Sequence, residues 1–268
     1  MTHGPVVAIT GGAGGIGLAV ARRYGAEGAG VALLDRSTEA LDTATSALER
    51  EGIEVLTIAC DVTEPEAPQR VVHAIRERFG RLDVLVHCAG LTHVSPFRDT
   101  ELSVYRRVME VNFFAAVLHT KAALPLLLES RGHIVVLSSV AGFAPLLGRT
   151  GYCASKHALH GFFDTLRAEL RDQGVHVMLV CPSFVQTDFA KAGLGGDGTT
   201  LSFERSTTGR PVTPDEVAEA VYHGVCKNRR LVVLPAMGRM AYWCSRLFPG
   251  CYERLMRRRF RIELDRLT

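Results

Sequence analysis

The stretch Val6-Val-Ala-Ile-Thr10-Gly-Gly-Ala-Gly-Gly-Ile-Gly17 decides the fold, because an apolar run leads directly into a glycine-rich segment and then into a helical pattern. Glycines let the backbone turn tightly and approach a pyrophosphate closely. The start of the following helix offers free N–H groups and the positive end of the helix dipole to the same anion. This order of strand, glycine loop and helix predicts a dinucleotide-binding site.

Strand-like and helical stretches alternate along the rest of the chain. The short apolar runs are rich in Val, Ile and Leu, which is typical of strands in a parallel sheet covered on both faces. Strands are predicted at Val6–Thr10, Gly30–Asp35, Glu54–Cys60, Leu82–Cys88, His133–Ser138, Val175–Cys181 and Leu231–Leu234. Helices are predicted at Ile16–Glu27, Thr38–Glu51, Glu64–Phe79, Glu101–Glu129, Gly151–Asp172 and Pro214–Lys227. The alternation predicts an α/β fold with a single Rossmann-like, doubly wound parallel sheet and helices on both faces.

No repeat or linker divides the 268 residues, so we expect one Rossmann-type catalytic domain over residues 1–235 and a C-terminal extension of it over 236–268. The glycine-rich residues from about 187 to 212 predict a mobile substrate loop. No uninterrupted apolar run reaches the ~18 residues that a membrane-spanning helix needs, which predicts a soluble body. The seven cysteines are scattered and odd in number, so free thiols in a reducing cytoplasm are expected. No spacing of His and Cys predicts a metal site.

Acidic residues after two of the strands bear on the choice of cofactor. Asp35 ends the second predicted strand, where a carboxylate can accept hydrogen bonds from the adenosine ribose and would repel a 2′-phosphate. This favours NAD. Arg36 follows directly and could bind that phosphate, which keeps NADP as the alternative. Asp61 is placed to contact the adenine edge, and capping the next helix is its other possible role.

A serine, a tyrosine and a lysine form the candidate catalytic set. Ser139 follows the fifth predicted strand, and Tyr152 and Lys156 are four residues apart on a predicted helix, so these two share one face. A free tyrosine has a pKa of about 10 and is a poor base at neutral pH. A nearby ammonium stabilises the phenolate and lowers that pKa, which makes proton exchange with an alcohol feasible.

In combination these features resemble the short-chain dehydrogenase/reductase family in its compact single-domain form. Its motifs occur in the family's order and spacing over about residues 5–235, and include Ala89-Gly90 after the fourth strand, Asn112 in mid-helix and Pro182…Thr187. The resemblance implies a nicotinamide-dependent oxidoreductase. It implies that Tyr152 is the catalytic acid/base and that Lys156 lowers its pKa and holds the nicotinamide ribose.

The resemblance also implies roles for further residues. Ser139 would hydrogen-bond the substrate oxygen, and Asn112 would support a water-linked proton path to Lys156. The residues expected to bind the cofactor are Thr10, Gly11, Gly12, Gly14, Gly15, Ile16, Gly17, Asp35, Arg36, Asp61, Val62, Cys88, Ala89, Gly90, Tyr152, Lys156, Pro182, Ser183, Val185 and Thr187. By analogy with the family, the helices Glu101–Glu129 and Gly151–Asp172 predict a homodimer.

Three positions depart from the family's pattern. Cys88 stands where the family usually has an asparagine whose amide ties the sheet together. Ser183 stands where a glycine is usual, so the backbone beside the nicotinamide is less free. Pro235-Ala-Met-Gly238 replaces the Asp-Gly-Gly that often follows the last strand, which argues against the family's common tetramer.

The residues expected on the substrate side are apolar, and some of them are expected to belong to the core instead. They are Val94, Phe97, Phe143, Leu146, Leu147, Phe184, Phe189 and Leu194. Such a pocket suits a lipophilic secondary alcohol or ketone of steroid, retinoid, acyl or polyketide type. Arg149 is the one cation placed to grip an anionic group. The alternative function is a non-catalytic dinucleotide-sensing regulatory or scaffold protein, although such proteins typically lack the tyrosine or the lysine.

The C-terminal extension is basic. Residues 227–268 carry eleven basic and three acidic residues, whereas the preceding 226 residues carry 20 and 25. Two short amphipathic helices are predicted, Met237–Phe248 and Cys251–Phe260. They would rest on an anionic membrane surface, or pack on the body of the protein or on a second subunit. Nucleic-acid binding is not expected, because no recognised module accompanies the basic run.

Overall fold

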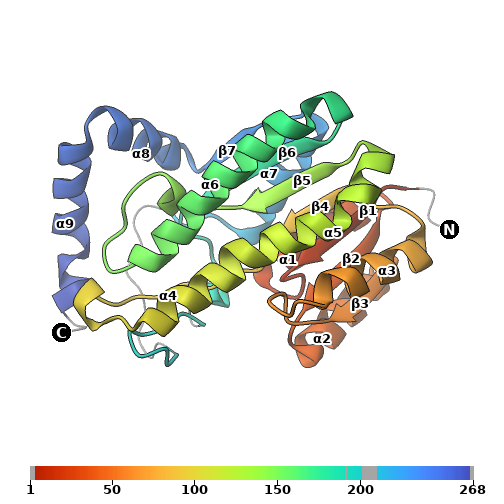
Figure 1. Ribbon diagram of the computed structural model, residues 1–268, viewed down its shortest axis with the longest axis horizontal. Helices are drawn as coiled ribbons and strands as arrows, with labels where there is room; N and C mark the ends of the chain where they lie inside the picture. Colours follow the sequence, from red (N-terminus) through yellow and green to blue (C-terminus); the bar gives the residue numbers. More distant parts are fainter. Residues whose placement is uncertain (1–3, 191, 201–209, 266–268) are drawn as a thin grey trace.

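The computed structural model describes residues 4–190, 192–200 and 210–265, and its centre is one parallel sheet in the order β3-β2-β1-β4-β5-β6-β7 (Figure 1). The strands are β1 Val6–Thr10, β2 Gly30–Asp35, β3 Val55–Ala59, β4 Val84–His87, β5 His133–Leu137, β6 His176–Pro182 and β7 Leu231–Leu234. The strand order reverses between β1 and β4, so the predicted doubly wound fold is confirmed. Ligands of such sheets bind at this reversal, outside the carboxyl ends of the strands.

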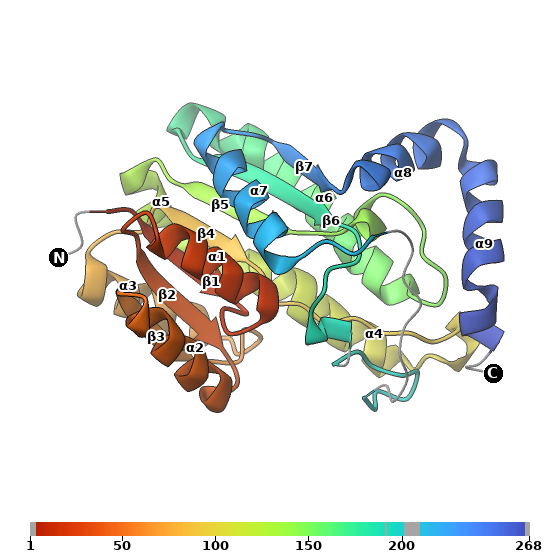
Figure 2. The same ribbon diagram turned by 180° about the vertical axis from the view of Figure 1, so that it is seen from behind.

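Helices cover both faces of the sheet. They are α1 Gly15–Gly25, α2 Thr38–Arg50, α3 Ala67–Phe79, α4 Leu102–Met109, α5 Ala115–Ser130, α6 Thr150–Leu170, α7 Pro214–Cys226, α8 Ala236–Leu247 and α9 Pro249–Asp265. Helices α1, α2 and α7 pack on one face, and α3, α5 and α6 on the other (Figures 1 and 2). A π-helical turn at Glu110–Phe114 joins α4 to α5, where the sequence predicted one uninterrupted helix.

Strand β1 shows why the central strands have continuous apolar sequences. Val7 and Ile9 enter the core beneath α1 and α7, whereas Val6 and Ala8 enter the core on the opposite face. All four side chains are fully buried. Alternate residues of a strand point to opposite faces, so a strand buried on both sides needs apolar residues throughout.

The continuous helix Leu102–Ser130 is long and apolar enough, by length and composition, to cross a membrane. In the structure one side of this helix packs on the fold, while Leu102, Phe114 and Leu118 are exposed. Its apolar window is 44% buried, and α5 packs against α3 and the sheet.

The C-terminal extension packs on its own domain. Helix α8 lies against β7 and against the turn Val140–Gly142, and α9 follows at the edge of the molecule (Figure 2). Tyr252 and Phe260 of α9 are buried. Of the predicted substrate loop, residues 191 and 201–209 lie outside the described residues. Its described part pairs with the segment after β4, since the N–H of Leu194 bonds the carbonyl of Thr92.

Candidate active site

The glycine loop after β1 closes on its neighbours so tightly that side chains are excluded. Gly11 has a φ of +66°, and a Cβ there would lie 2.9 Å from the backbone of Ala89. A Cβ on Gly17 would lie 2.2 Å from the carbonyl oxygen of Gly11. Helix α1 begins at Gly15, and its N-cap residue, Gly14, supplies no side-chain cap. The amides of the first turn are therefore open to an anion.

Two further segments meet the glycine loop, and together they fit a dinucleotide. A Cβ on Gly90 would lie 3.5 Å from Oδ1 of Asn112 and 3.9 Å from Nζ of Lys156. A Cβ on Gly15 would lie 2.7 Å from the side chain of Thr187, so the segment after β6 contacts the loop. The missing side chains leave a cradle at the strand reversal, as dinucleotide binding requires. The other residues predicted to hold the cofactor lie nearby in the chain. Gly12 is in the glycine loop and Ile16 is in the first turn of α1. Pro182 ends β6, and Val62, Ser183 and Val185 lie shortly after the ends of their strands.

The acidic residues at this edge differ in their local bonding. Oδ1 of Asp35 accepts the N–H of Ser37 at 3.3 Å, and Arg36 beside it is exposed. Oδ1 of Asp61 accepts both the N–H and the hydroxyl of Thr63, at 2.9 and 2.7 Å. These bonds lower the pKa of Asp61. Helix α3 begins at Ala67, with Glu66 as its N-cap residue and no side-chain cap, so Asp61 closes a turn at Thr63 and does not cap the helix. Its contact with adenine stays a prediction.

A threonine hydroxyl ties β1 to the end of β4. Oγ1 of Thr10 accepts the N–H groups of Cys88 and Ala89 at 3.1 and 3.2 Å. Desolvation raises the pKa of the Cys88 thiol to about 12, so the group stays neutral. The connection expected from the family's asparagine is therefore partly supplied by Thr10.

Helix α6 brings Tyr152 and Lys156 together at the carboxyl edge of β5. Nζ of Lys156 lies 5.7 Å from the centre of the Tyr152 ring. It donates a 2.8 Å hydrogen bond to the carbonyl oxygen of Leu137. The lysine is 4% exposed, and this burial lowers its pKa to about 8. An ammonium at this place stabilises a Tyr152 phenolate.

Asn112 connects the loop after β4 to the turn of α6 that carries Tyr152. It lies in the π-helical turn, almost fully buried. Its Oδ1 accepts the N–H of Leu91 at 2.6 Å, and its Nδ2 donates to the carbonyl of Leu91 and to Oγ of Ser155, both at 2.8 Å. Ser155 in turn donates to the carbonyl oxygen of Tyr152 at 2.8 Å. Ser155 is not among the site residues predicted from the sequence, although a hydroxyl directly before Lys156 on the predicted helix was a usable signal.

Ser139 lies at the end of β5 with its side chain half-buried. Its Oγ accepts the N–H of Ala141 at 3.1 Å, which begins the turn Val140–Gly142. A serine hydroxyl carries one donor in addition to its acceptor lone pairs. This bond does not use the donor, which can therefore serve a substrate oxygen.

The residues predicted to line the substrate side are placed in different environments. The ring of Phe189 lies 6.3 Å from that of Tyr152, and the ring of Phe143 packs against Tyr242 of α8 at 4.9 Å. Phe97 is 75% exposed. The remainder are buried (Val94 and Leu194) or half-buried (Leu146, Leu147 and Phe184). Their part in substrate binding stays a prediction.

Arg149, the cation considered for an anionic substrate group, is only 2% exposed. Its Nη1 donates to the carbonyl of Leu147 at 2.9 Å, and its guanidinium carbon lies 5.9 Å from the centre of the Phe260 ring. The side chain thus contacts α9, the last helix of the chain.

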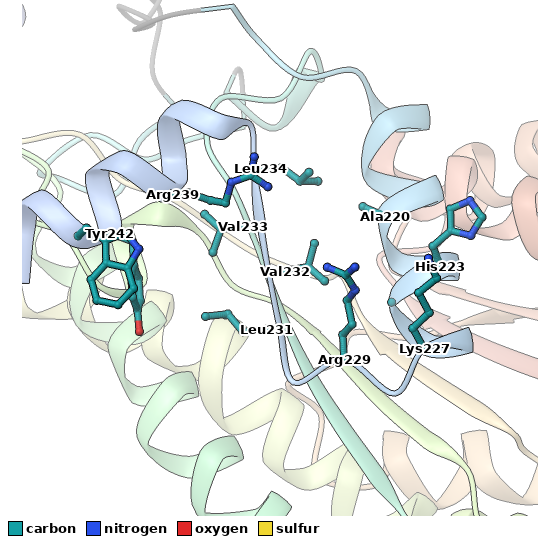
Figure 3. A pocket seen from close by; sticks show the side chains of 12 residues that line it. Ala220, His223, Lys227, Arg229, Leu231, Val232, Val233, Leu234, Arg239 and Tyr242 are labelled. Atoms are coloured by element: carbon teal, nitrogen blue, oxygen red, sulfur yellow. The ribbon is translucent and has the colours of Figure 1, made fainter.

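A separate cavity of about 410 Å³ lies along the edge strand β7, between α7 and α8 (Figure 3). None of the predicted site residues lines it. Its lining includes Lys227, Arg229, Arg239, Leu231, Val233 and Tyr242. Within the described part of the chain, no three His, Cys, Asp or Glu side chains gather where a metal ion could bind.

Comparison with known proteins finds similar sequences and similar folds. A family model described as short chain dehydrogenase matches residues 5–194. The bovine (Bos taurus) dehydrogenase/reductase SDR family member 7B is 35% identical over 266 residues, which cover 96% of this chain and 82% of the relative. The 11-beta-hydroxysteroid dehydrogenase 1A of Arabidopsis thaliana is 34% identical, over 94% of this chain and 74% of the relative.

Two solved structures extend the comparison. An actinorhodin polyketide ketoreductase variant with NADPH superposes with a TM-score of 0.78 at 31% identity, covering 87% of this chain and 97% of that one. A short chain dehydrogenase/reductase from Burkholderia phymatum in complex with NAD gives a TM-score of 0.79 at 24% identity, over 90% and 92%. This second likeness bears on the fold alone.

Proposed function

The chain belongs to the short-chain dehydrogenase/reductase family, and from this premise we propose that it transfers hydride between a nicotinamide and a lipophilic secondary alcohol or ketone. The observation that carries the proposal is the pairing of Tyr152 with a buried Lys156 beside Ser139 at the carboxyl edge of β5. A non-catalytic dinucleotide sensor is the alternative, and it would have no need of these three side chains together.

The cofactor that we propose is NAD. The open amides of α1 and the cradle at Gly90 would hold the pyrophosphate and the nicotinamide half. Asp35, at the end of β2, would accept the ribose hydroxyls, while the exposed Arg36 offers the route to NADP. The similar polyketide ketoreductase structure contains NADPH, so the preference for NAD rests on Asp35 alone. When bound, the nicotinamide supplies or accepts the hydride.

The protein's own groups handle the proton. In reduction, the Tyr152 hydroxyl gives its proton to the developing alkoxide, and in oxidation the phenolate takes the hydroxyl proton. Lys156, as the ammonium, lowers the energy of that phenolate. Ser139 donates its hydroxyl hydrogen to the substrate oxygen, and Asn112 keeps the turn that carries Tyr152 attached to the loop after β4.

The substrate class follows from the apolar side chains around Tyr152. Phe189 adjoins the tyrosine ring, and Phe143, Leu146 and Leu147 lie on the segment between Ser139 and α6. Such a lining suits a molecule with a large apolar body and one reacting oxygen. Relatives named as a hydroxysteroid dehydrogenase and a polyketide ketoreductase support a lipophilic alcohol or ketone of steroid, retinoid, acyl or polyketide type.

By analogy with the family, the protein is proposed to be a cytoplasmic homodimer.

The C-terminal extension is proposed to contact a membrane surface. Five large apolar residues of the extension are at least 60% exposed: Met240, Trp243, Leu247, Phe248 and Leu255. Exposed arginines accompany them: Arg239, Arg246, Arg254, Arg257 and Arg258. Apolar side chains with flanking cations suit an anionic bilayer. The protein should sediment with anionic but not neutral vesicles at low salt, and no binding to either would contradict the membrane contact.

The test of the function is an initial-rate screen of lipophilic ketones and secondary alcohols with NAD(H) and NADP(H), with Tyr152→Phe as the control. We expect turnover with NAD(H) that the variant abolishes while it still binds cofactor. Turnover with NADP(H) instead would show that Arg36 outweighs Asp35. Cofactor binding without turnover of any compound would favour the sensor.

A further inference from the structure

The loop after β4 places an imidazole at the start of the helix that carries Tyr152. His93 is fully buried, and its Nε2 accepts the backbone N–H of Gly151 at 2.9 Å. The first amides of a helix lack partners within the helix, and a side chain at the N-cap usually bonds one of them. The N-cap residue of α6, Arg149, makes no such bond. A side chain 58 residues away in the sequence therefore caps this helix.

We propose that His93 is the positioning residue of the catalytic turn. Its imidazole fixes the amide of Gly151 and thereby holds Tyr152, the next residue, in place against the substrate. The inference rests on the proposed function, because it assigns Tyr152 the proton transfer.

The start of α6 is shaped to receive this imidazole. A Cβ on Gly151 would lie 2.9 Å from Nε2 of His93 and 2.6 Å from the ring of Tyr105. Only a residue without a side chain lets both rings approach this closely. The His93 and Tyr105 rings are 5.6 Å apart and nearly perpendicular, and the Tyr105 hydroxyl lies 3.2 Å from that of Thr150. Histidine, glycine and tyrosine thus form one matched contact around the first turn.

The bond to Gly151 requires one form of the histidine. Nε2 accepts, so a neutral ring carries its proton on Nδ1, whereas a protonated ring would turn a second N–H toward the amide. Burial, together with the positive charge of Arg149, lowers the pKa of His93 to about 4. The acceptor is therefore present throughout the neutral range.

The opposite ring nitrogen gives a reason to assign His93 more than a packing role. Among the described residues, Nδ1 has no hydrogen-bond partner, although it is buried. A buried donor without an acceptor costs stability, and an apolar side chain would avoid that cost. What the histidine adds, and an apolar residue cannot, is the acceptor at Gly151.

Loss of this acceptor would loosen one end of the catalytic turn. Tyr152 is held on its other side by the bond between its carbonyl and Ser155, which Asn112 supports. Without His93, α6 keeps this second anchor, so the helix persists while its first residues fray. The tyrosine hydroxyl then spends less time in line with the reacting oxygen, which lowers kcat more than it weakens substrate binding.

The test compares His93→Met with His93→Gln. Glutamine carries an acceptor oxygen to about the position of Nε2, and methionine fills similar space without one. We expect His93→Met to lower kcat by up to ~10²-fold with a nearly unchanged KM, and His93→Gln to restore most of that loss. The exposed His157 of the same helix supplies the control, because His157→Met should leave kcat unchanged.

Amide hydrogen exchange in residues 149–153 gives a readout that needs no substrate. Exchange there should be faster in His93→Met than in the parent and close to the parent in His93→Gln. Unchanged exchange and kcat in His93→Met, or equal losses in both variants at equal melting temperature, would overturn the role of His93. If the parent turns over no compound but exchange responds as expected, the proposed function fails and the cap stands.

Discussion

The side-chain ammonium of Lys156 donates a 2.8 Å hydrogen bond to the carbonyl oxygen of Leu137, the last residue of β5. The bond attaches α6 to the sheet beside Ser139, and it places the ammonium out of contact with water. Taking a charged group out of water costs free energy, so burial lowers the pKa of Lys156 to about 8 from its ordinary 10.5. The charged form, which stabilises a Tyr152 phenolate, is thus maintained at the expense of stability.

The buried lysine predicts a pH-dependent difference in stability between the parent and Lys156→Met. Between pH 8 and 10.5 the unfolded chain binds more protons at this lysine than the folded chain, so the stability of the parent rises with pH across this window. Below pH 8 the whole penalty is present. The free energy of unfolding of Lys156→Met minus that of the parent should therefore fall by roughly 3 kcal/mol from pH 8 to 10.5.

Urea unfolding at several pH values between 7 and 10.5 measures this difference. Lys121 is exposed on α5, so Lys121→Met is the matched control. Its free energy of unfolding relative to the parent should change much less with pH. A difference for Lys156→Met that does not change with pH would mean that the ammonium is not desolvated in the folded protein.

The hydrogen bonds of Asn112 predict that its substitution destabilises the protein. Its amide makes three hydrogen bonds, two to Leu91 and one to Ser155. Asn112→Leu would leave the N–H and carbonyl of Leu91 without these partners, and we expect a destabilisation of roughly 3 kcal/mol, measured by urea unfolding. Ser155→Ala should cost about 1 kcal/mol. Equal stability of Asn112→Leu and the parent would show that the loop does not depend on this amide.

The sequence could predict the fold because most of its signals are local. β1, β2 and β7 were predicted with the bounds that the structure has. β1 and nearly all of β2 are buried on both faces and are therefore mostly apolar. β7 is the half-buried edge strand, but its sequence Leu-Val-Val-Leu is apolar throughout. The pairing of Tyr152 with Lys156 was also predictable, because residues four apart on a helix share a face.

The contacts that position these residues could not be predicted in the same way. His93 and Gly151 are 58 residues apart, and the Ser245 hydroxyl bonds the carbonyl of Phe143 across 102 residues. No local period records such pairs, because they arise only when separate elements pack together. The π-helical turn that carries Asn112 is likewise a departure from regular helix geometry that hydrophobic spacing does not reveal.

Substitution of Gly90 by alanine is expected to give a protein that folds but binds the cofactor poorly. An added methyl group would meet Oδ1 of Asn112 and the ring of Phe189 at 3.5 Å, which are ordinary contacts, and would lie 3.9 Å from Nζ of Lys156. We expect the free energy of unfolding of Gly90→Ala to lie within about 0.5 kcal/mol of that of the parent. The methyl group would occupy the proposed cradle, so the Kd for NAD(H) should rise by about tenfold, a change equivalent to about 1.4 kcal/mol.

Titration of NADH fluorescence measures this Kd. Gly17→Ala provides the contrast, because its methyl group would lie 2.2 Å from a backbone oxygen and should destabilise the fold itself. Unchanged cofactor affinity in Gly90→Ala would exclude the space beside Lys156 from the binding site.

The last helix predicts that the basic extension is an integral part of the domain. Phe260 is 1% exposed, and its ring lies beside the guanidinium of Arg149, the residue that precedes α6. Removing a buried aromatic ring leaves a cavity, so Phe260→Ala should lower the free energy of unfolding by roughly 3–5 kcal/mol. Leu255 of the same helix is 60% exposed, and Leu255→Ala should change the free energy of unfolding by no more than about 0.5 kcal/mol.

The same two variants separate packing of α9 on the domain from contact of α9 with a membrane. Leu255→Ala should weaken binding to vesicles with little change in stability. If Phe260→Ala unfolds like the parent, α9 does not pack stably on Arg149.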